Sequence, residues 1–204
     1  MTDPAQTVYV VDDDDAVRDS LLELMESMGI RAAGFDSAAS FLDHFDPSLE
    51  GCLVLDIRMP GMSGMELQAR LKELGSRLPI IFITGHGDVP MAVEAMKNGA
   101  IEFIQKPFRD QELLDCIQGA LEKAEQERQR HQLVESVESG LQSLTARELE
   151  ILEHIVDGHA NKFIALELGI SQRTVENHRA RILRKMGVRS TPELIRLVVS
   201  SREG

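Results

Sequence analysis

Acidic, hydroxyl and ammonium side chains follow four separate apolar segments in the first half of the sequence. In chain order, Asp12 and Asp13 follow Val8–Val11, Asp56 follows Cys52–Leu55, Thr84 follows Ile80–Ile83, and Lys106 comes after Ile101–Ile104. If these segments are parallel strands, their carboxyl ends meet at one edge of a sheet, where ligands bind in open α/β folds. We therefore expect three carboxylates, a hydroxyl and an ammonium to converge there.

The expected cluster limits the chemistry of the site. Carboxylates about 4 Å apart repel by about 1–4 kcal/mol per pair, so they need a nearby cation or a raised pKa. Oxygen ligands suit a hard cation, which predicts Mg²⁺ bound through one or two carboxylates, waters and a phosphoryl oxygen. Together with Lys106, such a cation would stabilise a phosphoryl group on one carboxylate, and aspartyl phosphate is a known covalent form of aspartate.

A second candidate site is a basic helix near the C-terminus. Residues 171–189 carry six basic side chains and one acid, Glu176. On a helical wheel Val175, Ile182 and Met186 form a buried stripe, and Arg173, Asn177, Ala180 and Arg184 lie opposite. Arginine and asparagine on an exposed helix face suit the DNA major groove. A solvated charged face is the alternative, which the preceding Gly169–Ser171 turn and the local charge of +5 disfavour.

Two different patterns must position these residues. Up to about residue 120, the four apolar segments and a weaker one at Ile30–Phe35 alternate with helix-period segments. This alternation predicts five parallel strands covered by helices on both faces. The last 60 residues are helical throughout by pattern, with helices beginning near Ala146, Asn161, Gln172 and Thr191. The short turn between the second and third of these predicts a helix-turn-helix.

The segment between the two patterns is polar on every side around Glu122–Gln132. We interpret it as the last helix of the first domain continuing into a solvated linker. A weak heptad of Leu114, Ile117, Leu121 and Ala124 leaves a dimer seam as the alternative. The predicted domains are therefore 1–121, a helical linker at 122–143, and 144–204.

Charge divides along the same boundaries. The 204 residues carry a net charge of −12, which taken whole argues against a nucleic-acid partner. Residues 1–122 have a net charge of −13, however, and residues 144–204 have +2. There is no apolar run long enough for a bilayer, no secretory signal at the N-terminus, and only two cysteines. We expect a reduced, cytoplasmic chain with no membrane partner.

Specific motifs add a resemblance. Val10–Asp13, Leu55–Gly64, Ile83–Asp88 and Gln105–Phe108 resemble the receiver domain of two-component response regulators. Leu144–Glu148, Asn161–Ala165, Thr174–His178 and Lys185–Val188 are similar to the LuxR-type helix-turn-helix. Together they resemble a FixJ/NarL-type regulator. The resemblance implies a flavodoxin-like sheet of order 2-1-3-4-5, followed by an all-α domain of four helices.

For the receiver, the resemblance implies that a histidine kinase phosphorylates Asp56. It implies Mg²⁺ ligation by Asp13, Asp56 and the Arg58 carbonyl, with Asp12 acting mainly through water. Lys106 would contact the phosphoryl oxygens, with a cis bond to Pro107. Thr84 would move inward after phosphorylation and the ring of Phe103 would follow, although phenylalanine lacks the hydroxyl of the tyrosine frequent at that position. Arg58 and His86 occupy positions that modulate dephosphorylation.

For the C-terminal domain, the expected outcome is sequence-specific binding of double-stranded promoter DNA, with homodimerisation on phosphorylation and RNA polymerase as a further partner. The predicted contacts are Lys162, Arg173, Thr174, Glu176, Asn177, Ala180, Arg181, Arg184 and Lys185.

Two other classes of protein remain as alternatives. One is a Mg²⁺-dependent phosphohydrolase that works through an aspartyl phosphate, although no substrate pocket is evident. The other is an adaptor whose helical domain binds only protein, which Arg173 and Arg184 disfavour. We expect that the protein is not an enzyme.

Overall fold

The computed structural model describes residues 6–85 and 89–202 and divides the chain into two compact units, with the boundary between Glu127 and Arg128. No helix in these described ranges combines the length and apolar composition that crossing a membrane requires. Helix α5, Asp110–Gln142, includes residues of both units. The two units are therefore treated one at a time.

The first unit is built on the predicted five-stranded parallel sheet. Its strands are β1 (Thr7–Val11), β2 (Ala32–Phe35), β3 (Gly51–Asp56), β4 (Ile80–Thr84) and β5 (Glu102–Gln105). Their order is β2-β1-β3-β4-β5, and every neighbouring pair is parallel, which confirms the predicted fold. The central strands β3 and β4 are buried along their whole length, which explains their uninterrupted apolar sequence.

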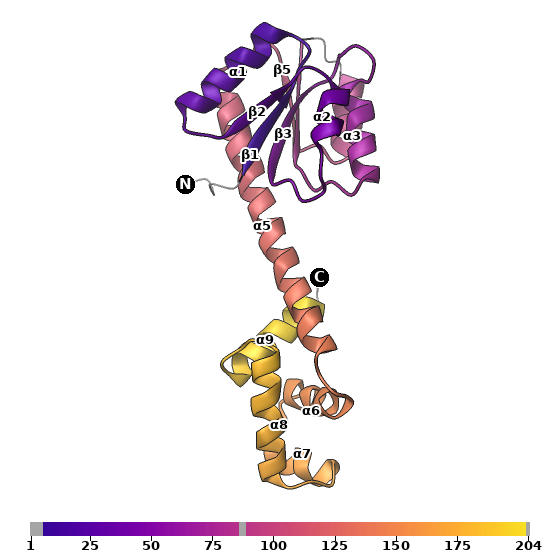
Figure 1. Cartoon of the computed structure of the whole chain (residues 1–204), viewed down its shortest axis with the longest axis vertical. Helices are drawn as coiled ribbons and strands as arrows, with labels where there is room; N and C mark the ends of the chain where they lie inside the picture. Colours follow the sequence, from indigo (N-terminus) through magenta and orange to yellow (C-terminus); the bar gives the residue numbers. More distant parts are fainter. Residues whose placement is uncertain (1–5, 86–88, 203–204) are drawn as a thin grey trace. The chain divides into compact units, whose positions relative to one another are not determined.

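Helices cover both faces of this sheet, as Figure 1 shows with α1 on one side and α2 and α3 on the other. Alternation along β1 sends Tyr9 and Val11 into one core and Val8 and Val10 into the other. The first core includes residues of α2 (Ala38–His44), α3 (Gly64–Glu73) and α4 (Val89–Lys97). The second includes residues of α1 (Asp15–Ser27) and the first part of α5. This packing holds the carboxyl ends of β1, β3, β4 and β5 at one edge.

The second unit contains the four predicted helices. They are α6 (Ala146–Val156), α7 (Asn161–Glu167), α8 (Gln172–Lys185) and α9 (Thr191–Arg202). Thr145 and Glu148 form a capping box that begins α6, and Ser171 caps α8 by accepting from the Thr174 amide. Each cap satisfies backbone donors that a helix N-terminus leaves unpaired.

The end of the predicted linker differs from a solvated helix. Val137 on α5 is 1% exposed, and it and Leu141 pack into the core formed by α6 to α9. Gly140 lies against Met186, where a Cβ atom would come 2.9 Å from the sulfur. The second unit therefore packs the last turns of α5 together with its four helices. The apolar spacing of Val137, Leu141 and Leu144 was the available signal, diluted by the polar residues between them.

Candidate functional site

Lys106 joins two buried carboxylates at the carboxyl edge of the sheet. Its Nζ donates to Asp12 Oδ2 at 2.7 Å and to Asp56 Oδ1 at 2.9 Å. Asp12 follows β1, Asp56 ends β3, and Lys106 follows β5, so three separate strands supply the cluster. Residues 94 and 50 positions from Lys106 thus meet because parallel strands end together. The peptide bond between Lys106 and Pro107 is cis, as predicted.

Both carboxylates are also held by backbone amides. Asp12 Oδ1 accepts from the Asp14 N–H at 3.0 Å, and Asp56 Oδ2 accepts from the Arg58 N–H at 2.7 Å. In each carboxylate, one oxygen therefore accepts a hydrogen bond from the Lys106 ammonium, and the other accepts one from a backbone amide in the loop that follows the strand. These bonds orient both side chains before any ligand arrives.

Burial and charge oppose each other in this cluster. Asp12 and Asp56 are 1% and 6% exposed. Burial raises the pKa of Asp56 above its ordinary value, against the lowering effect of the Lys106 ammonium, and the neighbouring Asp12 charge raises it further. Burial acts to lower the pKa of Lys106, but its bonds to Asp12 and Asp56 outweigh burial and the pKa is raised. The ammonium therefore stays charged and compensates two carboxylates.

The remaining predicted residues of this edge differ in exposure. Asp13 is exposed, and so is the side chain of Arg58. Thr84 ends β4 and is 1% exposed, in register with Gln105 of β5. Phe103 is half-buried on β5 opposite Phe82. His86 lies outside the described residues.

The donor set fits a hard cation. Asp12, Asp13 and Asp56 offer only oxygen ligands, which is the preference of Mg²⁺, and the exposed Asp13 leaves access for water. Within residues 6–85 and 89–202, no three His, Cys, Asp or Glu side chains lie close enough together to hold a metal by themselves. A cation here would therefore need backbone, water or phosphoryl oxygens to complete its ligands, which is usual for Mg²⁺.

Two residues that position Asp12 and Asp56 were not predicted from the sequence. Arg18 on α1 donates from Nη1 to the Asp12 carbonyl at 2.9 Å and also pairs with Asp15. Gly64 begins α3, and a Cβ atom there would lie 2.3 Å from the Asp56 carbonyl oxygen. Only a residue without a side chain lets α3 approach the end of β3 so closely. The glycine was visible within the Leu55–Gly64 motif, whereas nothing in the sequence pointed to Arg18.

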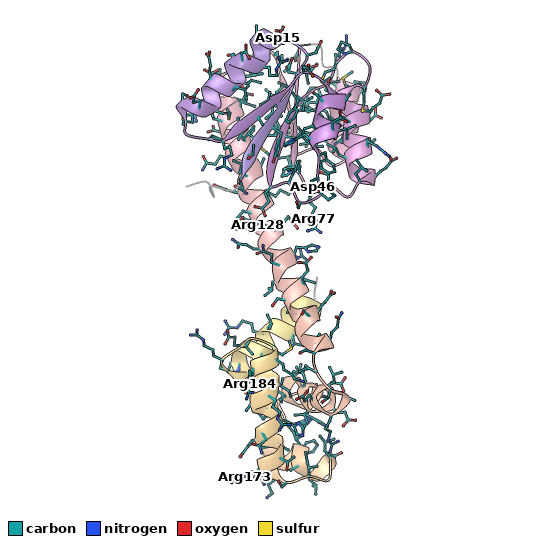
Figure 2. The ribbon with its side chains drawn as sticks, viewed as in Figure 1. Asp15, Asp46, Arg77, Arg128, Arg173 and Arg184 are labelled. Atoms are coloured by element: carbon teal, nitrogen blue, oxygen red, sulfur yellow. The ribbon has the colours of Figure 1, made fainter. Side chains whose placement is uncertain are left out.

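The second candidate site is the exposed face of α8. Val175 and Ile182 are fully buried and Met186 is 5% exposed, as the helical wheel predicted. The residues exposed on the opposite face are Arg173, Glu176, Asn177, Ala180, Arg181 and Arg184. Figure 2 shows Arg173 at the beginning of α8 and Arg184 near its end. The exposed Lys162 lies in the first turn of α7, and Thr174 is half-buried with its hydroxyl 2.8 Å from that of Ser171.

Two basic residues of α8 are engaged inside the unit. Lys185, predicted as a DNA contact, donates from Nζ to Glu148 Oε2 at 2.7 Å and to the Ser143 carbonyl at 2.8 Å. These bonds join the end of α8 to the start of α6, a pairing that helical periodicity could not reveal. The role of Lys185 as a DNA contact stays a prediction. Arg179 donates to the Thr191 hydroxyl at 3.0 Å, and burial lowers its pKa.

Comparison with protein families matches both units. Residues 8–118 match the response regulator receiver domain, and residues 142–198 match the bacterial regulatory proteins of the luxR family. The receiver match alone covers more than half of the chain.

Individual proteins are similar to most of the chain. The chain is 48% identical to the response regulator protein TodT of Pseudomonas putida, over 97% of this chain and 87% of that protein. It is 46% identical to the transcriptional regulatory protein FixJ of Azorhizobium caulinodans, over 94% of this chain and 91% of that protein. Among solved structures, the response regulator StyR is 49% identical with a TM-score of 0.86, over 95% of this chain and 98% of that chain.

Proposed function

Because the chain belongs to the two-component response regulators that join a receiver domain to a LuxR-type DNA-binding domain, we propose that phosphorylation of Asp56 controls its binding to promoter DNA. The observation that carries the proposal is the Lys106 ammonium shared by Asp12 and Asp56. It places a fixed positive charge beside a carboxylate that is oriented and almost fully buried. We assign residues 1–121 to the receiver, 122–143 to the linker and 144–204 to the DNA-binding domain.

The proposed chemistry is phosphoryl transfer from a histidine kinase. An Asp56 carboxylate oxygen forms a bond to phosphorus as the phosphorus–nitrogen bond of the kinase phosphohistidine breaks, and the electron pair leaves on that imidazole. Lys106 contacts the phosphoryl oxygens and offsets their charge. Mg²⁺ held by Asp13, Asp56 and the Arg58 carbonyl, with Asp12 acting through water, would supply further positive charge.

The same site supports a conformational switch. Thr84 ends β4, which pairs with the strand that ends in Asp56, so a phosphoryl group on Asp56 offers Thr84 a new hydrogen-bond acceptor. Phe103 lies on the adjacent strand β5. Inward movement of Thr84 leaves space for the ring of Phe103 to follow. The resulting change in the β4 and β5 surface promotes homodimerisation, which pairs two DNA-binding domains and raises their affinity through effective concentration.

The exposed face of α8 would enter the major groove. Bases or phosphates can be contacted by Arg173, Asn177 and either Arg181 or Arg184. Glu176 can accept a hydrogen bond from a cytosine amino group, and Ala180 can contact a thymine methyl. Lys162 on α7 would contact a phosphate, as would the hydroxyl of Thr174. We infer RNA polymerase as a further partner of such a regulator. We also infer that the protein acts in the cytoplasm.

Acetyl phosphate labelling tests the receiver part of the proposal. Asp56→Asn should abolish incorporation of a phosphoryl group, measured on phosphate-affinity gels, whereas the exposed control Asp46→Asn should label like the parent protein. Full labelling of Asp56→Asn would remove the site assignment. Steady turnover of p-nitrophenyl phosphate, beyond one phosphoryl group per chain, would support the phosphohydrolase instead.

Salt dependence tests the DNA-binding part. In the phosphorylated full chain, Arg181→Ala combined with Arg184→Ala should weaken promoter binding and reduce the slope of log K against log salt by about 2 per monomer, because each phosphate contact contributes about 0.9. A matched pair of exposed arginines in the first unit, Arg70→Ala with Arg77→Ala, should leave the slope unchanged. Equal slopes for the two double variants would refute the role of α8.

A further inference from the structure

Two histidines face each other at the turn between α6 and α7. His154 lies in the last turn of α6, and His159 precedes α7 by two residues. Their Nδ1 atoms are 3.2 Å apart, and both side chains are half-buried. Neither residue belongs to the acidic cluster or to the exposed face of α8, so the proposed function leaves this pair without a role.

The backbone and a neighbouring ring hold the pair in place. The His159 N–H donates to the His154 carbonyl at 3.0 Å, and the Gly158 N–H donates to the Ile155 carbonyl at 3.1 Å. Gly158 has φ of +79°, so these bonds form the tight C-terminal cap that favours glycine. The His159 ring stacks on Phe163, with centroids 4.3 Å apart and planes at 28°. Little conformational freedom remains to be lost when a ligand binds to both rings.

The separation of the two nitrogens fits a shared metal ion. Zinc–imidazole bonds are about 2.0–2.1 Å long, so nitrogens 3.2 Å apart subtend about 103° at the metal, close to the tetrahedral angle. We propose that His154 and His159 together form a site for a borderline divalent transition metal, for which Zn²⁺ is the test ion. Imidazole ligands favour Zn²⁺, Cu²⁺ and Ni²⁺ over Mg²⁺, which separates this site chemically from the oxygen-rich cluster around Asp56.

Binding requires a change of tautomer in one ring. In the neutral pair, one Nδ1 carries the proton of the hydrogen bond between the rings and the other accepts it. When a metal takes both Nδ1 lone pairs, that proton leaves Nδ1 and the same ring takes one from solvent at Nε2, so both rings stay neutral. Within residues 6–85 and 89–202, no third His, Cys, Asp or Glu side chain completes a set of three. Water fills the remaining positions, so the ion exchanges readily.

Titration of the full chain with Zn²⁺ tests the site. Excess Mg²⁺ should be present to occupy oxygen ligands, and ¹⁵N NMR of the imidazoles should report which nitrogens bind. We expect large shifts of Nδ1 in both His154 and His159. Replacing either histidine by alanine should lower the affinity at least about tenfold, since even loss of an outer partner costs that much. The control His131→Ala, on α5 with a 44% exposed side chain, should leave the affinity unchanged.

Hydrogen exchange supplies an independent measurement. Zn²⁺ at ten times its Kd should slow exchange of the amides around Gly158 about elevenfold, if opening of the turn breaks the site. The proposal is overturned if Zn²⁺ leaves the Nδ1 signals of the parent protein unchanged, or if only one of the two alanine variants loses affinity. The NMR result on the parent protein decides the question even if a variant fails to fold.

Discussion

The contact between Glu148 and Lys185 offers a quantitative test of the second unit. Glu148 is 3% exposed, and its Oε2 accepts from the Thr145 amide at 2.9 Å, the Thr145 hydroxyl at 3.0 Å and Lys185 Nζ at 2.7 Å. Glu148→Ala removes half of a capping box, at about 1 kcal/mol. It also removes an ion pair, which contributes about 1 kcal/mol because the Lys185 side chain is one-third exposed. We expect a loss of about 2 kcal/mol in the free energy of unfolding of this unit.

Amide hydrogen exchange of α6 and α8, followed by mass spectrometry of the full chain, measures this loss. A change of 2 kcal/mol corresponds to about 30-fold faster exchange. The matched control is Glu150→Ala, which removes a surface ion pair with Arg147 at 2.7 Å. An exposed pair of this kind contributes about 0.5 kcal/mol or less, which predicts at most about twofold faster exchange.

The pH dependence of the same contact has a definite sign. The hydrogen bond from Lys185, followed by that from the Thr145 amide, lowers the pKa of Glu148 from 4.5 to about 2. Its stabilisation is therefore fully present above pH of about 4.5 and is lost as the pH falls toward 2. The ratio of exchange rates between Glu148→Ala and the parent protein should shrink across that window. The reasoning would be refuted if Glu148→Ala and Glu150→Ala exchanged at equal rates. It would also be refuted if the ratio of exchange rates between Glu148→Ala and the parent protein did not change with pH.

Two further substitutions probe close packing. Gly64→Ala should destabilise the first unit by about 1–3 kcal/mol in urea denaturation and reduce phosphoryl labelling of Asp56, because the new Cβ would lie 2.3 Å from the Asp56 carbonyl oxygen. The control Gly119→Ala, with open space around it inside α5, should be neutral or stabilising. Val137→Ala should cost the second unit about 2 kcal/mol by hydrogen exchange, whereas Leu133→Ala, 44% exposed, should cost about 0.5 kcal/mol or less. Equal effects within either pair would contradict the packing described.

The sequence alone predicted the sheet and the residues at its edge for a local reason. Strand and helix periods are properties of short segments, and the residue that follows a strand must lie where the strand ends. The positions of Asp12, Asp56 and Lys106 were therefore predictable before their contacts were known. The buried stripe of α8 was predictable in the same way, since Val175 and Ile182 lie on the same face of a single helix, about two turns apart, and both are fully buried.

Only the tertiary structure decided which partner each polar side chain takes. Lys106 could have faced solvent, yet its ammonium joins two carboxylates brought together by strand packing. Lys185 shares the basic pattern of α8 but bonds to Glu148, and Val137 lies in a polar segment but enters a core. The sequence determines the type and local direction of a side chain. Which donors, acceptors and apolar surfaces then meet it depends on elements distant in the chain, and these are positioned only when the whole unit packs.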